Sequence, residues 1–107
     1  MILREIYLGQ CKRLEIQGDI NKLDLEQLSR HVAASREAAA IVLDLSGVLF
    51  AGSDFLNFLV DLRQRSPELA RKIMLHNPNE VIAELLTLTQ LDQLFAVCHD
   101  DAVKLVM

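Results

Sequence analysis

The chain has 107 residues, of which 51% are hydrophobic and 24% are charged, and its formal net charge is −4. This length and composition fit one folded domain over residues 1–107 and argue against an intrinsically disordered chain. The negative charge argues against nucleic-acid binding, because a phosphate backbone requires a basic face. The densest group of basic residues in the sequence consists of Arg63, Arg65, Arg71 and Lys72. We expect these side chains to be solvated, at the end of a helix and the start of a strand.

Several features indicate a cytoplasmic protein that does not insert into a membrane. Residues 1–5 contain no long apolar segment of the kind found in secretory signals. No stretch of the chain is apolar for long enough to span a bilayer. Cys11 and Cys98 lack C-x-x-C spacing and lie in apolar runs, so we expect them to be buried free thiols.

Two strands joined by a tight turn are predicted at the start of the chain. Apolar and polar residues alternate over residues 2–8 and 11–17, which is the pattern of half-buried strands. Residues 9–10, Gly-Gln, can form the turn between them. The first helix is predicted over residues 24–37, because Asp24 can cap it and an apolar stripe recurs at helical spacing.

The rest of the chain alternates strands with helices. The nearly all-apolar run over residues 40–45 is typical of a strand covered on both faces, and therefore of a central position in a largely parallel sheet. A helix is expected at about 54–65 and a strand over 73–75. The next predicted element is a helix that Asn77 caps and Pro78 begins, with Glu80 completing a capping box. A strand over residues 94–98 and a short helix from Asp100 to Leu105 are predicted after it.

This order of elements predicts an α/β fold with a mixed sheet. The chain contains three histidines, His31, His76 and His99, at spacings that do not suggest a metal site. It has neither a P-loop nor a G-x-G-x-x-G motif for a nucleotide, and no G-x-S-x-G motif for acyl transfer. We therefore expect no cofactor, no bound metal and no enzymatic activity.

Asp44 is the carboxylate that most needs explanation, because it lies inside the most apolar strand, where an unpaired charge is costly. In one interpretation it is a strand-end residue that accepts backbone hydrogen bonds. In the other it serves a metal site or a phosphate relay. The absence of a second carboxylate beside it in the sequence favours the first interpretation.

The segment from Ile41 to Leu56 resembles the central part of STAS domains. In that family an apolar strand ends in Asp-Leu-Ser or a similar triplet, and a short apolar segment then leads to Asp-Ser-Ser/Thr-Gly-Leu at the start of a helix. Here the strand reads Ile-Val-Leu-Asp-Leu-Ser-Gly, and the helix start reads Gly-Ser-Asp-Phe-Leu from Gly52. Residues 74–78, Met-Leu-His-Asn-Pro, and the Leu-Phe pair at 94–95 resemble the second half of the family.

This resemblance runs in order from about residue 11 to the end of the chain. It implies a single STAS-like domain with a mixed sheet of four to five strands, an N-terminal hairpin and about four helices packed mainly on one side. In the branch of anti-sigma factor antagonists, the first Ser of the motif is phosphorylated by an anti-sigma factor that is itself a serine kinase. Here that residue is Ser53, whose phosphorylation would end binding of the partner.

The sequence departs from the family motif at three positions. Gly52 stands where the family usually has Asp, Asp54 where it has a second Ser or Thr, and Phe55 where it has Gly. Ser53 is therefore expected to be either a phosphorylated residue or only the cap of a helix that begins at Asp54. Phe55 is expected to be either part of the core or an apolar residue exposed on the docking surface.

We expect the residues that bind the partner to lie around Ser53, on a loop from Ser46 to Gly52 that presents Asp54 and Phe55. Weaker candidates for the same surface precede the first helix; they are Gly18, Asp19 and Asn21. The expected partner is an anti-sigma factor of the serine-kinase type, with a phosphatase as a second one. The alternative is a STAS protein that is not phosphorylated, either a scaffold or a small subunit of a signalling or transporter ATPase complex.

Overall fold

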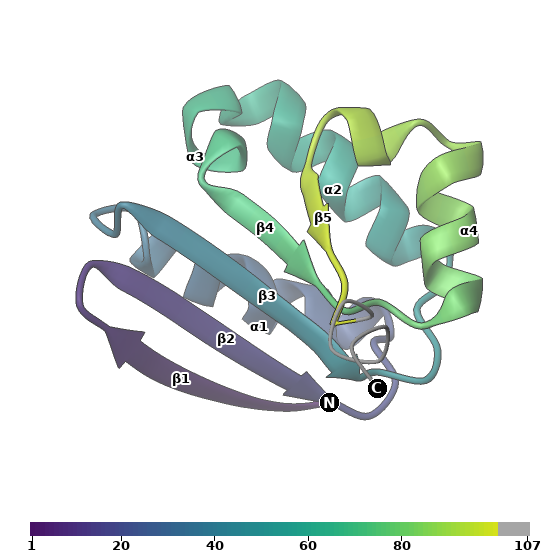
Figure 1. Ribbon diagram of the computed structural model, residues 1–107, viewed down its shortest axis with the longest axis horizontal. Coiled ribbons are helices and arrows are strands. Elements are labelled where there is room, and N and C mark those ends of the chain that lie inside the picture. The colour runs from purple at the N-terminus through teal and green to yellow at the C-terminus, as the bar shows by residue number, and fades with distance from the viewer. Residues whose placement is uncertain (101–107) are drawn as a thin grey trace.

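A five-stranded mixed sheet forms the centre of the computed structural model, which describes residues 1–100 (Figure 1). The strands follow one another across the sheet in sequence order, from β1 to β5. β1 pairs with β2 antiparallel, and every later neighbour is parallel. The strands are β1 (Ile2–Leu8), β2 (Cys11–Gln17), β3 (Ala40–Gly47), β4 (Ile73–His76) and β5 (Ala96–Cys98).

Helices connect the parallel strands, and α1 and α2 lie behind the sheet in the view of Figure 1. Each parallel connection needs such a crossover, because parallel strands cannot be joined by a tight turn. The helices of residues 1–100 are α1 (Lys22–Ala34), α2 (Ser53–Arg65), α3 (Pro67–Arg71), α4 (Glu80–Leu88) and the 3-10 turn η1 (Leu91–Gln93).

The core lies between the sheet and the helices. Alternate residues of the strands point to this side and are fully buried, and Leu14, Leu43 and Leu75 expose none of their surface. The helices contribute residues at helical spacing, among them Leu28 and Leu59, which are also fully buried. The core is aliphatic apart from Phe55 and Phe95, as the composition predicts.

The predicted strands and their order are confirmed, with the two strands of the hairpin at the predicted residues. The predicted helix starts are wrong in detail. α1 begins at Lys22, capped by Asn21, and Asp24 instead occupies the third helical position and completes the capping box. α4 begins at Glu80 and is capped by Asn79, because Asn77 has a φ of 57°, which ends the strand in a turn.

Other boundaries also shift. α1 ends at Ala34, three residues earlier than predicted. The last strand is shorter than the predicted 94–98, because η1 closes with hydrogen bonds from the N–H groups of Leu94 and Phe95 to the carbonyl of Leu91. The helix expected from Asp100 to Leu105 lies outside the described residues.

The two cysteines are not buried as expected: Cys11 is half-buried and Cys98 is exposed. Both lie on strand positions that face away from the core, opposite Ala40 and His76 respectively. No helix among residues 1–100 has the length and apolar character needed to cross a bilayer.

Candidate functional site

The loop between β3 and α2 presents two large apolar side chains to solvent. Val48 and Ala51 are buried and fix the ends of the loop against the core. Leu49 and Phe50, between them, expose 79% and 60% of their surface. An exposed apolar pair held between two buried anchors is typical of a surface that contacts another protein.

The loop before α1 lies alongside this apolar loop. The N–H of Ile20 donates to the carbonyl of Phe50 at 3.0 Å, and Ile20 and Ala51 form a parallel bridge. The N–H of Gly18 donates to the carbonyl of Gly47, also at 3.0 Å. The structure therefore brings the predicted candidates Gly18 and Asp19, both exposed, to the same end of the molecule as Ser53.

Asn21 and Asn79 hold these loops in place by capping helices. The side-chain oxygen of Asn21 accepts a hydrogen bond from the N–H of Asp24 at 3.2 Å. Asn79 accepts from the N–H of Ile82 at 2.9 Å, and its amide nitrogen donates to the carbonyls of Val48 and Leu49 at 3.2 and 2.9 Å. The side chain of Asn79 thus ties the start of α4 to the apolar loop.

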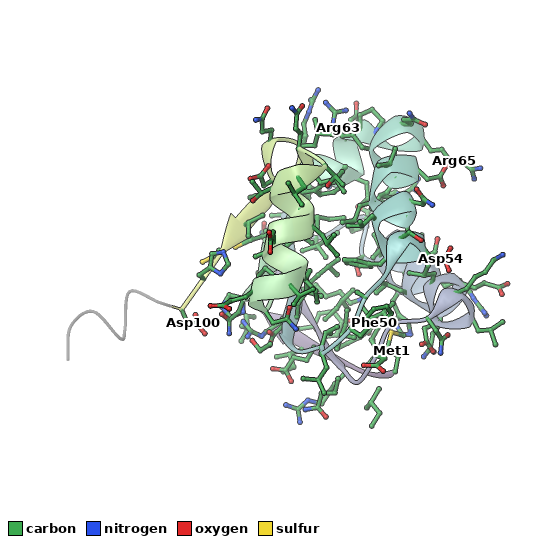
Figure 2. All side chains as sticks on the ribbon, turned by 90° about the vertical axis from the view of Figure 1, so that its right-hand side faces the viewer. Met1, Phe50, Asp54, Arg63, Arg65 and Asp100 are labelled. Atoms are coloured by element: carbon green, nitrogen blue, oxygen red, sulfur yellow. The ribbon has the colours of Figure 1, made fainter. Side chains whose placement is uncertain are left out.

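Ser53 is exposed at the first residue of α2 (Figure 2 labels the adjacent Asp54). The expectation that Ser53 caps this helix is wrong, because Gly52 is the cap residue and supplies no side-chain hydrogen bond. Asp54, also exposed, lies in the first turn, where a negative charge interacts favourably with the helix dipole. The hydroxyl of Ser53 is therefore accessible from outside the domain.

Phe55 is not part of the surface. It exposes 0% of its area and stacks against Phe58 with a centroid distance of 6.3 Å. Its placement among the partner-binding residues is therefore wrong, and the alternative of a core residue is confirmed. The reason is geometric: in α2 the buried positions are Phe55 and Leu59, four residues apart on one side of the helix.

Asp44 belongs to a hydrogen-bonded cluster on the face of the sheet opposite the core. It accepts hydrogen bonds from the N–H and hydroxyl of Ser46 at 3.0 and 2.6 Å and from the guanidinium of Arg13 at 2.7 Å. His76 lies between Asp44 and Asp100, with ring nitrogens 3.3 and 2.9 Å from their carboxylates. The interpretation of Asp44 as a strand-end acceptor of backbone hydrogen bonds is confirmed only for the N–H of Ser46, because β3 continues to Gly47 and the other partners of Asp44 are side chains.

This cluster sets the charge state of Asp44. Burial by itself raises the pKa of the Asp44 carboxyl, but hydrogen bonds from Ser46, Arg13 and His76 outweigh it and lower the pKa to about 2. The cluster could not be seen in the sequence, because Arg13, Asp44 and His76 come from three different strands. In residues 1–100, no group of three His, Cys, Asp or Glu side chains is placed to hold a metal ion.

The exposed apolar residues around Ser53 were not predicted from the sequence. Leu23 is one of them and exposes 84% of its surface inside α1. The run Val48-Leu49-Phe50-Ala51 did carry a signal. Its four consecutive apolar residues lie in a short segment between a strand and a helix, and such connecting segments run over the surface, which favours exposure of at least one of these side chains.

Several solved structures have the same fold as this chain. An anti-sigma factor antagonist from Mycobacterium paratuberculosis is 20% identical and aligns over 91% of this chain and 84% of its own, with a TM-score of 0.75. The antagonist SpoIIAA in its unphosphorylated form is 12% identical over 96% of each chain, with a TM-score of 0.74. The Bacillus cell fate determinant SpoIIAA in its phosphorylated form is 12% identical over 99% of this chain and 100% of its own, with a TM-score of 0.69.

At these identities the likeness establishes the fold. A family model described as "Mlab, STAS domain" matches residues 7–98. This range includes β2 to β5, the last two residues of β1, both loops around Ser53 and the cap residue Asn79. The match extends over most of the chain, and the protein therefore belongs to this family of STAS domains.

Proposed function

We propose that the protein is a cytoplasmic binding module of the anti-sigma factor antagonist type, which acts by binding a partner protein and not by catalysis. The observation that carries the proposal is the position of Ser53. It is exposed at the first residue of α2, beside the exposed apolar pair Leu49 and Phe50. A hydroxyl that can accept a phosphate thus lies next to side chains suited to docking.

The docking surface in this proposal consists of the exposed residues at this end of the domain. They are Gly18, Asp19, Asn21, Leu23, Leu49, Phe50, Ser53 and Asp54, together with the half-buried Gly52 that precedes Ser53. The hydrogen bonds from Ile20 and Asn79 to the apolar loop hold it in one conformation, which reduces the entropy lost on binding. The proposed partner is an anti-sigma factor of the serine-kinase type, with a phosphatase that restores the unphosphorylated form.

A phosphate on Ser53 would switch binding without unfolding the domain. It would add about −1.5 to −2 charges at pH 7, at a helix N-terminus that accommodates anions. Asp54 already places a carboxylate next to it. A partner that covers Leu49 and Phe50 would then have to desolvate two adjacent negative groups, which opposes binding.

A second candidate is a STAS scaffold, or a small subunit of a signalling or transporter ATPase complex, that binds without phosphorylation. Two observations favour it. The matching family model is not described as one of antagonists. The residue before Ser53 is Gly52, where the antagonist motif has Asp. In this alternative the apolar loop binds a partner permanently and Ser53 is only one of its contacts.

The two candidates are separated by charge at residue 53. Wild type, Ser53→Ala and Ser53→Glu would be used as baits in extracts of the native cells, and the affinity of the recovered partner would then be measured with purified proteins. A switch predicts that Ser53→Ala binds as well as the unphosphorylated wild type, whereas Ser53→Glu binds at least tenfold more weakly, a difference of about 1.4 kcal/mol.

The matched control is Gln64→Glu, which adds the same charge at an exposed position near the other end of α2. It is expected to bind like wild type. Equal affinity of the partner for wild type, Ser53→Ala and Ser53→Glu would contradict the switch and favour the scaffold.

A further inference from the structure

A groove lies at the end of the domain opposite Ser53. Two cavities of about 330 and 140 Å³ adjoin there, between the C-terminal ends of α1 and α2 and the beginning of α3. They share four lining residues, Arg36, Arg65, Ser66 and Leu69, and therefore lie next to each other. In Figure 2, Arg63 and Arg65 mark this end of α2, and Asp54 marks the other.

The floor of this groove is apolar. Phe58 and Leu62 on α2 are partly buried and line the smaller cavity. Leu69 on α3 exposes 6% of its surface and lines both cavities. Such a floor offers contact area to apolar side chains, which a site for a small hydrated anion would not need.

The rim of the groove carries more cations than carboxylates. Arg36, Arg65 and Lys72 line it together with Asp61 and Glu68, and Lys72 is held in place because its amine donates to the carbonyl of Arg36 at 2.8 Å. Arg65 pairs only with the exposed Asp61, at 2.9 Å, and within residues 1–100 no ion pair involves Arg36. Exposed pairs of this kind contribute little energy, so both guanidinium groups can bind an incoming carboxylate.

The charge at this end is opposite to that of the whole protein. Five cationic side chains are found here, Arg36, Arg63, Arg65, Arg71 and Lys72, against three carboxylates, Glu37, Asp61 and Glu68. The complete chain nevertheless has a net charge of −4. The remaining surface is therefore strongly negative, which orients an acidic partner toward the groove.

We infer that this groove binds an acidic amphipathic segment of a partner protein, whose apolar side chains lie on the floor while its Asp or Glu side chains contact the rim. Arg65, which lines both cavities, is the last residue of α2, whereas Ser53 is its first. Phe58, the lining residue of α2 that is nearest to Ser53 in the sequence, lies five residues after it.

Nucleic acids and anionic membranes also carry many negative charges, but they fit this groove less well than an acidic peptide does. A nucleic acid needs a basic stripe that follows its backbone, whereas here the cations surround one short depression in an acidic protein. An anionic membrane is flat and contacts protruding residues, while Leu69 lies at the bottom of a concavity. A peptide meets both the charge and the shape requirement.

The probe is a random dodecapeptide library displayed on phage and selected on the immobilised full chain. The enriched sequences are expected to combine Asp and Glu with apolar residues. A synthetic copy of the most enriched peptide is then titrated by fluorescence polarisation, and its affinity is expected to fall as the salt concentration rises. Enriched sequences that are neutral or basic would overturn the proposal.

Charge-reversed variants locate the peptide. Arg36→Glu and Arg65→Glu are each expected to weaken binding about tenfold, as reversal of a rim charge replaces attraction by repulsion. Arg30→Glu is the matched control, since Arg30 is an exposed residue of α1 that lines neither cavity. Should a reversal lower the melting temperature, Arg65→Gln removes the charge without inverting it. Equal affinity for the groove variants and wild type, or displacement of the peptide by a single-stranded oligonucleotide or by phosphatidylglycerol vesicles, would overturn the proposal.

Discussion

The ring of Phe50 lies over Gly52, so that a Cβ atom built on residue 52 would come within 3.2 Å of the ring Cζ atom. The residue that departs from the family motif, Gly52, and the exposed aromatic residue of the docking loop are therefore coupled. Glycine at this position lets the ring approach the start of α2 closely, and any larger residue has to displace it. Gly52, which departs from the family motif, thus permits the position that the Phe50 ring takes in the loop.

This coupling predicts different effects for two substitutions of Gly52. Alanine is a poor cap and also displaces the ring, so Gly52→Ala is expected to destabilise the domain by about 0.5–1 kcal/mol. Aspartate displaces the ring as well but accepts hydrogen bonds from the N–H groups of the first turn, so Gly52→Asp should be nearly neutral. Urea denaturation measures both, and an alanine variant more stable than the aspartate variant would contradict the account.

Phe50 and Phe55 are predicted to differ sharply in their contribution to stability. Phe55 is fully buried, and Phe55→Ala should lower the free energy of unfolding by about 3–5 kcal/mol through lost burial and the cavity left behind. Phe50 exposes 60% of its surface, and Phe50→Ala should cost less than about 1 kcal/mol. The same denaturation experiment checks both; a loss of similar size in the two variants would show that Phe50 is a core residue.

Asn79 is predicted to fix the docking loop through its amide nitrogen and α4 through its oxygen. Asn79→Asp retains an oxygen that caps the helix but loses the two hydrogen bonds to the carbonyls of Val48 and Leu49. We expect faster hydrogen exchange in residues 48–52 with little change in α4. Asn79→Ala should lose both functions and about 1–2 kcal/mol of stability. Unchanged exchange of the loop in Asn79→Asp would contradict this role.

Asp44 is predicted to make the stability of the domain depend on pH in the acid range. Its pKa is about 2 in the folded protein, against 3.8 for an aspartate in an unfolded chain, so the unfolded chain binds the proton more tightly. The ionised carboxylate therefore contributes about 2 kcal/mol above pH 4, and this contribution is lost as the pH falls from 4 to 2. The unfolding free energy of wild type should fall more steeply over this range than that of Asp44→Asn. Parallel pH profiles of the two proteins would contradict the assignment.

The strands could be predicted from the sequence because their signals are local. Alternation marks β2, and the continuous apolar run marks β3 as a central parallel strand. The first residue of each helix could not be predicted exactly, because several residues that can cap a helix stand close together in the sequence. Asn21 and Asp24 both suit a cap, and only the packing of the helix decides that Asn21 is the cap residue and Asp24 completes the box.

The site was predictable in part. The order of motifs placed Ser53 at a helix start, which is where it lies. The burial of Phe55 depends on which face of α2 meets the sheet, and Phe55 and Phe58 compete for that face in the sequence. The groove was invisible for a similar reason, since Arg36 joins Arg65 and Lys72 of the basic stretch only in the folded protein.

The central claim is that Ser53 carries a phosphate that controls partner binding. The most direct test is to purify the protein from its native cells under growth and stress conditions, measure its intact mass and map any phosphate by fragmentation. The proposed switch predicts that a fraction of the protein molecules carries one added phosphate, located on Ser53. A chain that stays unmodified under all these conditions, or a phosphate at another residue, would contradict the switch and leave a permanently bound STAS scaffold as the better explanation.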